Sequence, residues 1–346
     1  MSAENLPTLT DTEDAAARAP QRPQRRRPSP AEIGNRYALV GVFLLIIALF
    51  SILRPETFPT LSDAQTIAST QAVVALLALG AMMPLICGEF DVSIAFQLGL
   101  SQALCAGLAI EHGWPAALAA LAAVCACLLV GLFNGLLVTR IGLNSFTATL
   151  GSGTLVLGLT ELYSNNETIS GALPGSFTSI GRDSVGEVPL PFVYVLAAAA
   201  VLWVAFEYTA WGRECHATGG NSVAARLAGV RTTRRTMQCY LLAGLLSGLS
   251  GVLSVMILGA SSPSVGLGEL LPAYAAAFLG ATAIRPGRFN SMGTILAIYF
   301  LATGITGLQL LGAKFYVSEL FYGGALLIAV TLSHVIGRRR GGGEAV

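Results

Sequence analysis

Residues 86–94 read ICGEFDVSI, and they place two acidic side chains, Glu89 and Asp91, in an otherwise apolar part of the chain. Apolar sequence lies on both sides: ALLALGAMMPLI ends at Ile86, and IAFQLGLSQALCAGLAI begins at Ile94. About 20 apolar residues are needed for a helix to cross a bilayer. The stretch therefore predicts a break between two membrane-spanning helices.

The composition is that of a membrane protein, because 54% of the 346 residues are hydrophobic and only 11% are charged. An ordinary soluble domain carries about 25% charged residues. The sequence therefore predicts an all-α fold, a polytopic transmembrane helix bundle. Its cysteines show no metal or disulfide spacing, so we expect them to pack inside the protein, and we expect no metal or cofactor in this chain. They are Cys87, Cys105, Cys125, Cys127, Cys215 and Cys239.

About ten apolar runs in the sequence are long enough to form transmembrane helices. They lie at about residues 37–53, 64–87, 92–110, 115–139, 143–163, 190–209, 236–258, 269–284, 290–311 and 317–336. These runs define a membrane domain at 36–337. We expect a disordered basic tail at 1–35 and a short tail at 338–346.

The distribution of basic residues predicts the orientation of the chain. With ten spans both termini lie on one side, and if that side is the cytoplasm, only Arg54, Arg182 and Lys314 lie outside. Cytoplasmic loops carry the excess of Lys and Arg in membrane proteins. We therefore expect both termini in the cytoplasm. The basic residues expected there are Arg18, Arg22, Arg25, Arg26, Arg27, Arg36, Arg140, Arg213, Arg226, Arg231, Arg234, Arg235, Arg285, Arg288, Arg338, Arg339 and Arg340.

The basic loop at residues 211–235 is expected to face the cytoplasm and to contain a short helix. Asn221 follows Gly220 and is a good N-cap, and Gly229 can take the left-handed conformation that ends a helix. The helix would present a small, apolar and cationic surface, made by Ala224, Ala225, Arg226 and Leu227. This surface fits docking into a groove of another protein, and it equally fits an anionic lipid surface.

Several motifs resemble those of the ribose-type permeases of ABC importers, in the same order along residues 37–336. The loop carries ATGGN at 217–221 and AARLAGV at 224–230, and GEFDVS at 88–93 is similar to the family's Gly-Gly-x-Asp-Leu-Ser stretch. Further similar stretches are NGLLV at 134–138, FTATLG at 146–151, ISGALP at 169–174, VPLP at 188–191 and GRFNSMGT at 287–294. Glu89 stands where that family often has glycine, so its role is left open.

The resemblance implies a bacterial inner-membrane permease that pairs with a second permease subunit, as a homodimer or a heterodimer. A cytoplasmic ABC ATPase would use ATP and engage the helix that begins at Asn221. An extracytoplasmic solute-binding protein would dock on the outer segment 164–189, which on composition alone equally fits a plain connecting loop. A monosaccharide is the implied cargo, with a nucleoside or another small polar solute as alternatives.

The sequence itself contains no phosphate-binding loop, and its only lysine is Lys314, so we expect no ATP hydrolysis by this chain. The three histidines lie in turns or at span ends and do not favour an intramembrane enzyme: His112, His216 and His334. No nucleic-acid partner is expected. The function expected is transport rather than catalysis.

The candidates for the translocation path are polar or turn-forming residues at breaks in the apolar runs: Gly88, Glu89, Asp91, Ser93, Asn134 and Asn290. Gly88 would end one helix, and Asp91 with Ser93 would cap the next. Asn134 would form a hydrogen bond between helices. The alternative is a proton- or sodium-coupled carrier that binds its ion at Glu89 and Asp91.

One motif recurs about 200 residues later and indicates an internal repeat. LGA at 79–81 and GEFD at 88–91 return, with one gap, as LGA at 279–281 and GRFN at 287–290. Each copy ends one span and begins the next, as in transporters built from repeated units. Chance similarity is the alternative. On the ten-span topology the two copies have the same orientation.

Overall fold

The computed structural model describes residues 30–58 and 60–340. The chain divides into two compact units, Met1–Gly34 and Asn35–Val346, and the second contains the membrane domain. The predicted disorder of the N-terminal tail lies almost wholly outside the described residues, because description begins at residue 30. The last residues of the C-terminal tail, 341–346, also lie outside them.

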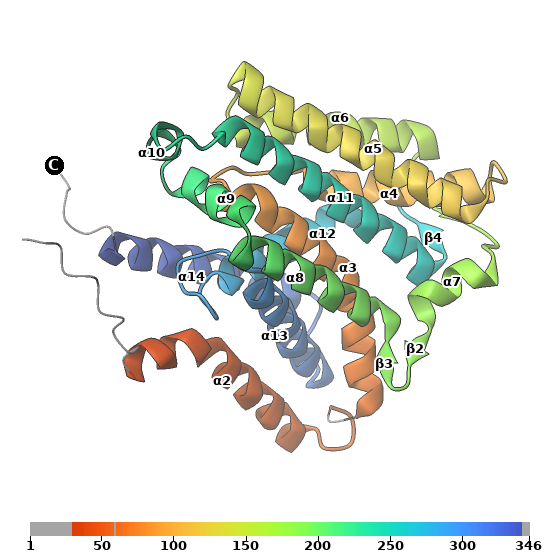
Figure 1. The fold of residues 1–346 in the computed structure, drawn as a ribbon. Coiled ribbons are helices and arrows are strands. Elements are labelled where there is room, and N and C mark those ends of the chain that lie inside the picture. The colour runs from red at the N-terminus through yellow and green to blue at the C-terminus, as the bar shows by residue number, and fades with distance from the viewer. Residues whose placement is uncertain (1–29, 59, 341–346) are drawn as a thin grey trace, which may run out of the picture. The chain divides into compact units, whose positions relative to one another are not determined.

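Each of the ten predicted spans falls on a helix among the described residues (Figure 1). These helices are α2 (Pro30–Leu53), α3 (Leu61–Ile86), α4 (Ser93–Ile110), α5 (Ala116–Leu136) with its π-helical continuation η1 (Leu137–Ile141), α6 (Ser145–Ser164), α8 (Leu190–Tyr208), α11 (Thr232–Leu258), α12 (Val265–Gly280), α13 (Ser291–Leu310) and α14 (Tyr316–Arg340). The fold is therefore the predicted helical membrane bundle.

Seven of these helices are long and apolar enough to cross a membrane by length and composition. The other three predicted spans fall on α6, α12 and α14. The apolar parts of α12 and α14 are short, at Val265–Gly280 and Tyr316–Thr331. Helix α12 also begins and ends four residues before the predicted span 269–284. Ten is therefore an approximate number of membrane crossings.

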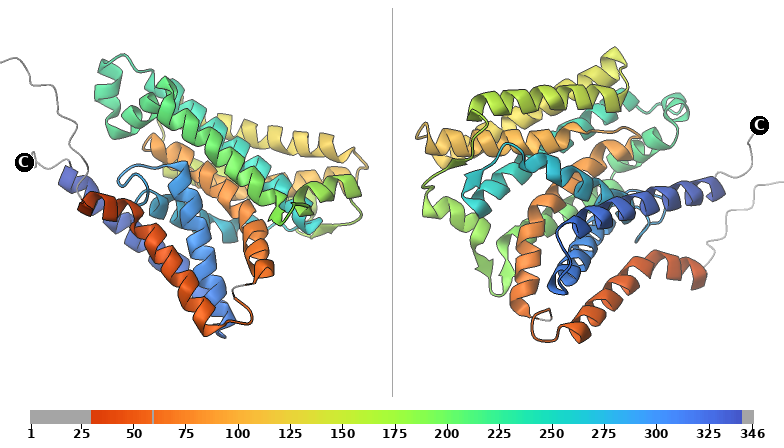
Figure 2. Two further views of the ribbon diagram at one scale, coloured as in Figure 1. Left: turned by 60° about the horizontal axis from the view of Figure 1, so that its bottom comes forward. Right: turned by 180° about the vertical axis from the view of Figure 1, so that it is seen from behind.

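Helix α3 lies at the centre of the bundle. All of its residues from Ala72 to Ile86 are buried, which is expected when a helix is apolar on every side and is surrounded by other helices. Helix α11 packs against α3, α4 and α5. Helices α12 and α13 also pack on α3, and α14 packs on both of them (Figure 2). Helix α3 thus connects two groups of helices.

Close helix packing requires glycine at several positions of α11. A side chain at Gly244 would overlap the main chain at Cys127 of α5, and one at Gly251 would overlap Ser101 and the carbonyl oxygen of Leu98 on α4. Small residues let helix backbones approach closely in membranes, where lipid is as apolar as leucine. This contact holds α11 against α4 and α5.

Residues 164–189 are more ordered than a plain connecting loop. They contain α7 (Gly175–Arg182) and a hairpin of β2 (Ser184–Val185) and β3 (Val188–Pro189). Strand β1 (Ile169–Ser170) pairs with β4 (Ala260–Ser261), which follows α11. The Gln65 side chain at the start of α3 donates a 2.8 Å hydrogen bond to the Glu187 carbonyl. We call the end of the bundle that carries these elements the hairpin end.

The opposite end carries the loop at 211–235 and the breaks between α3 and α4 and between α12 and α13. It is rich in arginine, including Arg140, Arg226, Arg231, Arg285 and Arg288, and we call it the basic end. The amide of Ile284 donates a 2.9 Å hydrogen bond to the carbonyl of Arg36, so the part of α2 around Arg36 also lies there. The ten-span topology predicts that successive loops lie alternately at the two ends of the bundle. The loops at the hairpin end and at the basic end agree with this prediction.

Candidate coupling site at the helix breaks

The break between α3 and α4 is built around a buried carboxylate. Gly88 has φ +83°, a left-handed conformation that glycine adopts without strain, and it turns the chain after α3. The Asp91 side chain is completely buried, and its Oδ1 accepts hydrogen bonds from the Ser93 amide (3.0 Å) and the Ser93 hydroxyl (2.5 Å). The Asp91 amide donates to the Tyr274 hydroxyl at 3.1 Å. Asp91 thus satisfies the first amide of α4, as expected.

Ser93 does not cap the start of α4, although the sequence predicted that it would. It is the first residue of α4, and its hydroxyl caps no amide. It donates to Asp91 and accepts from the side-chain amides of Gln97 (2.8 Å) and Asn134 (2.7 Å). A hydroxyl has one donor and two acceptor sites, so Ser93 is fully used. The residue is a connection between side chains and not a helix cap.

Asn134 of α5 makes the predicted hydrogen bonds between helices. Its Nδ2 donates to Ser93 of α4, and its Oδ1 accepts from Ser152 of α6 at 2.5 Å. The three residues are buried. Thr149 of α6 adds a further link, because its hydroxyl accepts from the Val92 amide at 3.0 Å. Three helices are therefore joined by side chains at this break.

Replacement of Asn134 by alanine is expected to destabilise the bundle by about 1–3 kcal/mol, because it removes two buried hydrogen bonds, one to Ser93 and one from Ser152. The measurement is the thermal unfolding midpoint of the purified protein in detergent. Gln309→Ala is the matched control, because Gln309 is an exposed polar side chain on α13. An equal midpoint for the two variants would contradict the role given to Asn134.

The two acids of this stretch do not share an environment. The Glu89 side chain is partly exposed, whereas Asp91 is buried. Burial raises the pKa of Asp91 to about 7, although the hydrogen bonds from Ser93 act in the opposite direction. Neither acid has a salt-bridge partner among the described residues. An ion site that uses both carboxylates has no support in this arrangement.

The break between α12 and α13 repeats the first break. Gly287 has φ +83°, the same value as Gly88. Asn290 takes the place of Asp91: it is the N-cap of α13, and its Oδ1 accepts from the Gly293 amide at 2.7 Å. Its Nδ2 donates to the carbonyls of Gly280 (3.2 Å) and Ala283 (3.1 Å). The repeated motif therefore has a structural counterpart.

The two breaks meet at one aromatic side chain of α12. The ring centroid of Phe278 lies 6.3 Å from that of Phe90 and 5.5 Å from that of Phe289. Helices α3 and α12 therefore end at the same end of the bundle. They run in the same direction along it, so the two copies of the motif have the same orientation, as the ten-span topology predicted.

The loop at 211–235 contains the predicted helix and a second one. Helix α10 (Ser222–Leu227) begins where expected, with the Asn221 side chain accepting from the Ala224 amide at 2.9 Å. Gly229 has φ +87° and follows the helix. Ala225 is buried, but the Val223 and Leu227 side chains are 68% and 86% exposed. Gly220, Ala224 and Arg226 are also exposed.

Beside α10 lies a cationic cavity of about 710 Å³. It is lined by Arg140, Arg226, Val230, Arg231, Thr232, Thr233, Arg234 and Met237. This part of the loop therefore presents exposed apolar side chains next to a cluster of guanidinium groups.

Helix α9 (Ala210–Gly220) was not predicted, and it packs directly on the first break. A side chain at Gly219 would overlap the Ile86 carbonyl oxygen. The Arg235 guanidinium forms a 2.7 Å ion pair with Glu214 and so ties α9 to α11. Burial, with smaller contributions from the charges of Arg288 and Arg285, lowers the pKa of His216 to about 4. Helix α9 therefore touches the first break and lies near the basic residues of the second.

A membrane bundle with polar helix breaks, and with a helical loop packed on one of them, has the construction of a transport subunit. The family model described as "Branched-chain amino acid transport system / permease component" matches residues 64–330. The chain belongs to this permease family. No solved structure matches it significantly.

Three curated relatives are similar to this chain over most of its length. The chain is 34% identical to a ribose import permease protein of Bacillus subtilis, over 85% of this chain and 90% of the relative. It is 28% identical to a D-allose transport system permease protein of Escherichia coli (88% and 93%). It is also 28% identical to a fructose import permease protein of Rhizobium meliloti (86% and 86%). The chain thus spans nearly the whole length of each relative.

Proposed function

We propose that this chain is the membrane subunit of an ABC importer and that it moves a monosaccharide across the bacterial inner membrane. The observation that carries the proposal is the contact of Gly219, in the helical loop, with the main chain of the α3–α4 break. Movement of the loop by a partner would reach the break at the end of α3, the central helix of the bundle. The names of the relatives support a sugar as the solute.

Helix α10 is the proposed contact with a cytoplasmic ATPase, which would bind and hydrolyse ATP. The exposed Leu227 and Val223 side chains can enter an apolar groove, and the surrounding arginines can pair with acidic residues at its rim. Gly220, Asn221, Ala224, Ala225, Arg226 and Gly229 would form the rest of this contact. Both termini would lie in the cytoplasm with the basic end.

At the hairpin end, α7 and the β2–β3 hairpin are the proposed contact for an extracytoplasmic solute-binding protein. Arg182 of α7 donates a 2.9 Å hydrogen bond to the Ile257 carbonyl of α11, so this surface is attached to the helix that also carries Arg235 at the basic end. A second permease subunit would complete the path, as a homodimer or a heterodimer. Transport would proceed by alternating access.

Leu227→Asp is expected to reduce the ATPase recovered with the purified permease by about tenfold, which corresponds to about 1.4 kcal/mol of interface energy. A charge at this position would have to be buried in the apolar part of the contact. The measurement is co-purification of the ATPase encoded with this permease, together with uptake of ribose, allose and fructose by cells. Leu311→Asp is the control, because Leu311 is a leucine that is 40% exposed at the end of α13, outside both proposed contacts.

Unchanged ATPase recovery with Leu227→Asp would contradict the docking role of α10 and favour a lipid-surface role. An ion-coupled carrier makes a different prediction, since it would accumulate solute in vesicles that have an imposed ion gradient and no ATP. Uptake under that condition would contradict the ABC importer. Uptake of a nucleoside, but of none of the three sugars, would retain the importer and change only its solute.

A further inference from the structure

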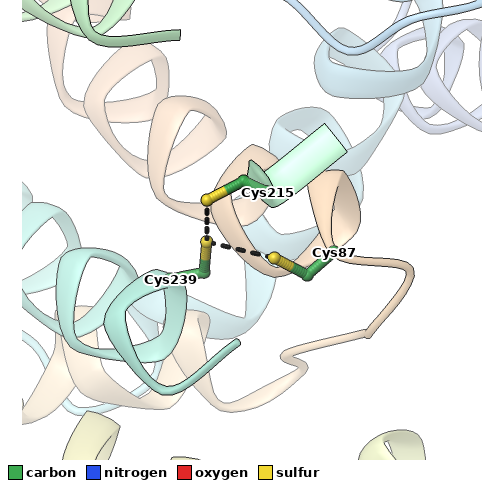
Figure 3. A group of neighbouring side chains, drawn as sticks. All are labelled: Cys87, Cys215 and Cys239. Atoms are coloured by element: carbon green, nitrogen blue, oxygen red, sulfur yellow. Dashed lines mark hydrogen bonds between the residues drawn. The ribbon is translucent and has the colours of Figure 1, made fainter. Parts of the chain in front are cut away.

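Three cysteines that are far apart in the sequence meet where the loop, α3 and α11 come together (Figure 3). Cys87 is the C-cap of α3, Cys215 lies on α9 and Cys239 lies on α11. The Sγ atoms are 3.4 Å apart for Cys87 and Cys239 and 4.0 Å apart for Cys239 and Cys215, and all three lie within 4.8 Å of one another. All three residues are buried.

These separations are close to those that a single metal ion requires. A metal bound to thiolates at about 2.3 Å in a trigonal plane holds its sulfur atoms about 4.0 Å apart. The three thiols come from three separate elements, and their sulfur atoms face one another in Figure 3. Small side-chain movements would therefore place all three sulfur atoms around one ion.

We propose that Cys87, Cys215 and Cys239 form a binding site for one thiophilic metal ion, and that Cu(I) is preferred over Zn(II). Thiolates are soft ligands that select Cu(I) and Zn(II) over harder cations. A structural zinc site nearly always has four protein ligands. Among the described residues, no fourth cysteine, histidine or carboxylate joins this group. Three sulfur ligands are sufficient for Cu(I).

Each thiol that binds the metal loses its proton to solvent as its sulfur–metal bond forms. Copper enters and remains as Cu(I), so no electron is transferred.

A bound ion would join α9 to the end of α3 and to α11. It would therefore hold the loop on the first helix break and slow any step in which α9 moves. This consequence for transport rests on the proposed function, whereas metal binding itself does not.

The binding test uses the full-length protein in detergent under anaerobic conditions, titrated with Cu(I) against a chromogenic Cu(I) chelator. We expect one Cu(I) per chain and an affinity about 100-fold lower in Cys239→Ser, because a ligand is lost. Cys105→Ser is the matched control, since Cys105 is a buried cysteine of α4 outside the cluster and should leave the affinity unchanged. A parallel titration with Zn(II) tests the metal preference.

X-ray absorption of the copper-loaded wild-type protein provides a readout that depends on no variant, and three sulfur ligands are expected. Absence of stoichiometric Cu(I) binding, or a copper ion without three sulfur ligands, would overturn the site. Tighter binding of Zn(II) than of Cu(I) would overturn the metal preference.

The consequence for transport is tested in liposomes that hold the permease with its ATPase and binding protein. Copper should slow sugar uptake by the wild type and not by Cys239→Ser. Equal copper sensitivity of the two proteins would contradict the effect of the ion on α9. Absence of uptake with and without copper would count against the proposed function and leave the metal-binding result unchanged.

Discussion

Replacement of Gly219 by alanine is expected to lower the unfolding midpoint and abolish sugar uptake, whereas the same replacement at the next residue, Gly220, should leave the unfolding midpoint at the wild-type value. A methyl group at Gly219 would overlap the Ile86 carbonyl oxygen and press on the main chain at Cys87 and Gly88. A methyl group at Gly220 meets nothing within 4 Å. The two glycines are neighbours at the end of α9, so the pair isolates the contact with the helix break.

Overpacking of a close contact typically costs about 1–3 kcal/mol. The added methyl group would meet backbone atoms, which cannot rotate away. The Gly219→Ala protein is therefore expected to unfold at a lower temperature in detergent and to lose the position of α9. The measurements are the unfolding midpoint, sugar uptake and ATPase activity stimulated by the binding protein. Equal unfolding midpoints for the Gly219→Ala and Gly220→Ala proteins, or wild-type uptake by the Gly219→Ala protein, would contradict the role given to this contact.

The helix positions could be predicted from the sequence because apolar length and end signals are local properties. The ten apolar runs correspond to ten helices, and the Asn221 and Gly229 signals correctly bound α10. Gly88 and Gly287 also mark the two breaks, since both adopt the left-handed conformation that glycine favours. The fold class and the position of the breaks therefore follow from short-range chemistry.

Helix α9 could not be predicted, because its sequence AWGRECHATGG contains three glycines, each of which costs helix stability. Tertiary contacts stabilise it. Gly212 packs against the main chain of Phe206, and Gly219 packs against that of Ile86. The residues that weaken the helix in isolation are the ones that allow its close packing.

The three-thiol cluster was missed for a related reason. Cys87 and Cys215 are separated by more than a hundred residues, so no local spacing signals a shared site. Ser93 was misassigned as a cap because its partner Asn134 lies on another helix and reaches it only once α4 and α5 are packed together. Local sequence signals thus predict elements, while the contacts between elements require the folded chain.

Replacement of Asp91 by alanine is expected to destabilise the protein by about 1–2 kcal/mol and to reduce uptake strongly, because the Ser93 amide at the start of α4 loses its acceptor. Asp91→Asn is expected to keep most of the stability and the uptake. The asparagine oxygen can still accept from Ser93. The change also removes a carboxylate that has an oxygen, Oδ2, without a hydrogen-bond partner.

The pH dependence of stability should also distinguish the wild type from the Asp91→Asn protein. The pKa of Asp91 is raised from the usual 3.8 to about 7, so the folded protein binds this proton more tightly than the unfolded chain does. The resulting stability is fully present below pH 3.8 and is lost as the pH rises through about 7. The unfolding midpoint of the wild type should therefore fall across this range relative to that of Asp91→Asn.

Asp91→Asn also distinguishes the importer from the ion-coupled carrier, since the two assign different roles to the same carboxylate. A helix-capping oxygen is retained in asparagine, but a titrating carboxylate that binds a proton or sodium ion is removed. Uptake near the wild-type level by Asp91→Asn, together with loss of uptake in Asp91→Ala, is expected if Asp91 holds the start of α4. A folded Asp91→Asn protein without uptake would instead require the negative charge and would favour an ion-coupled mechanism.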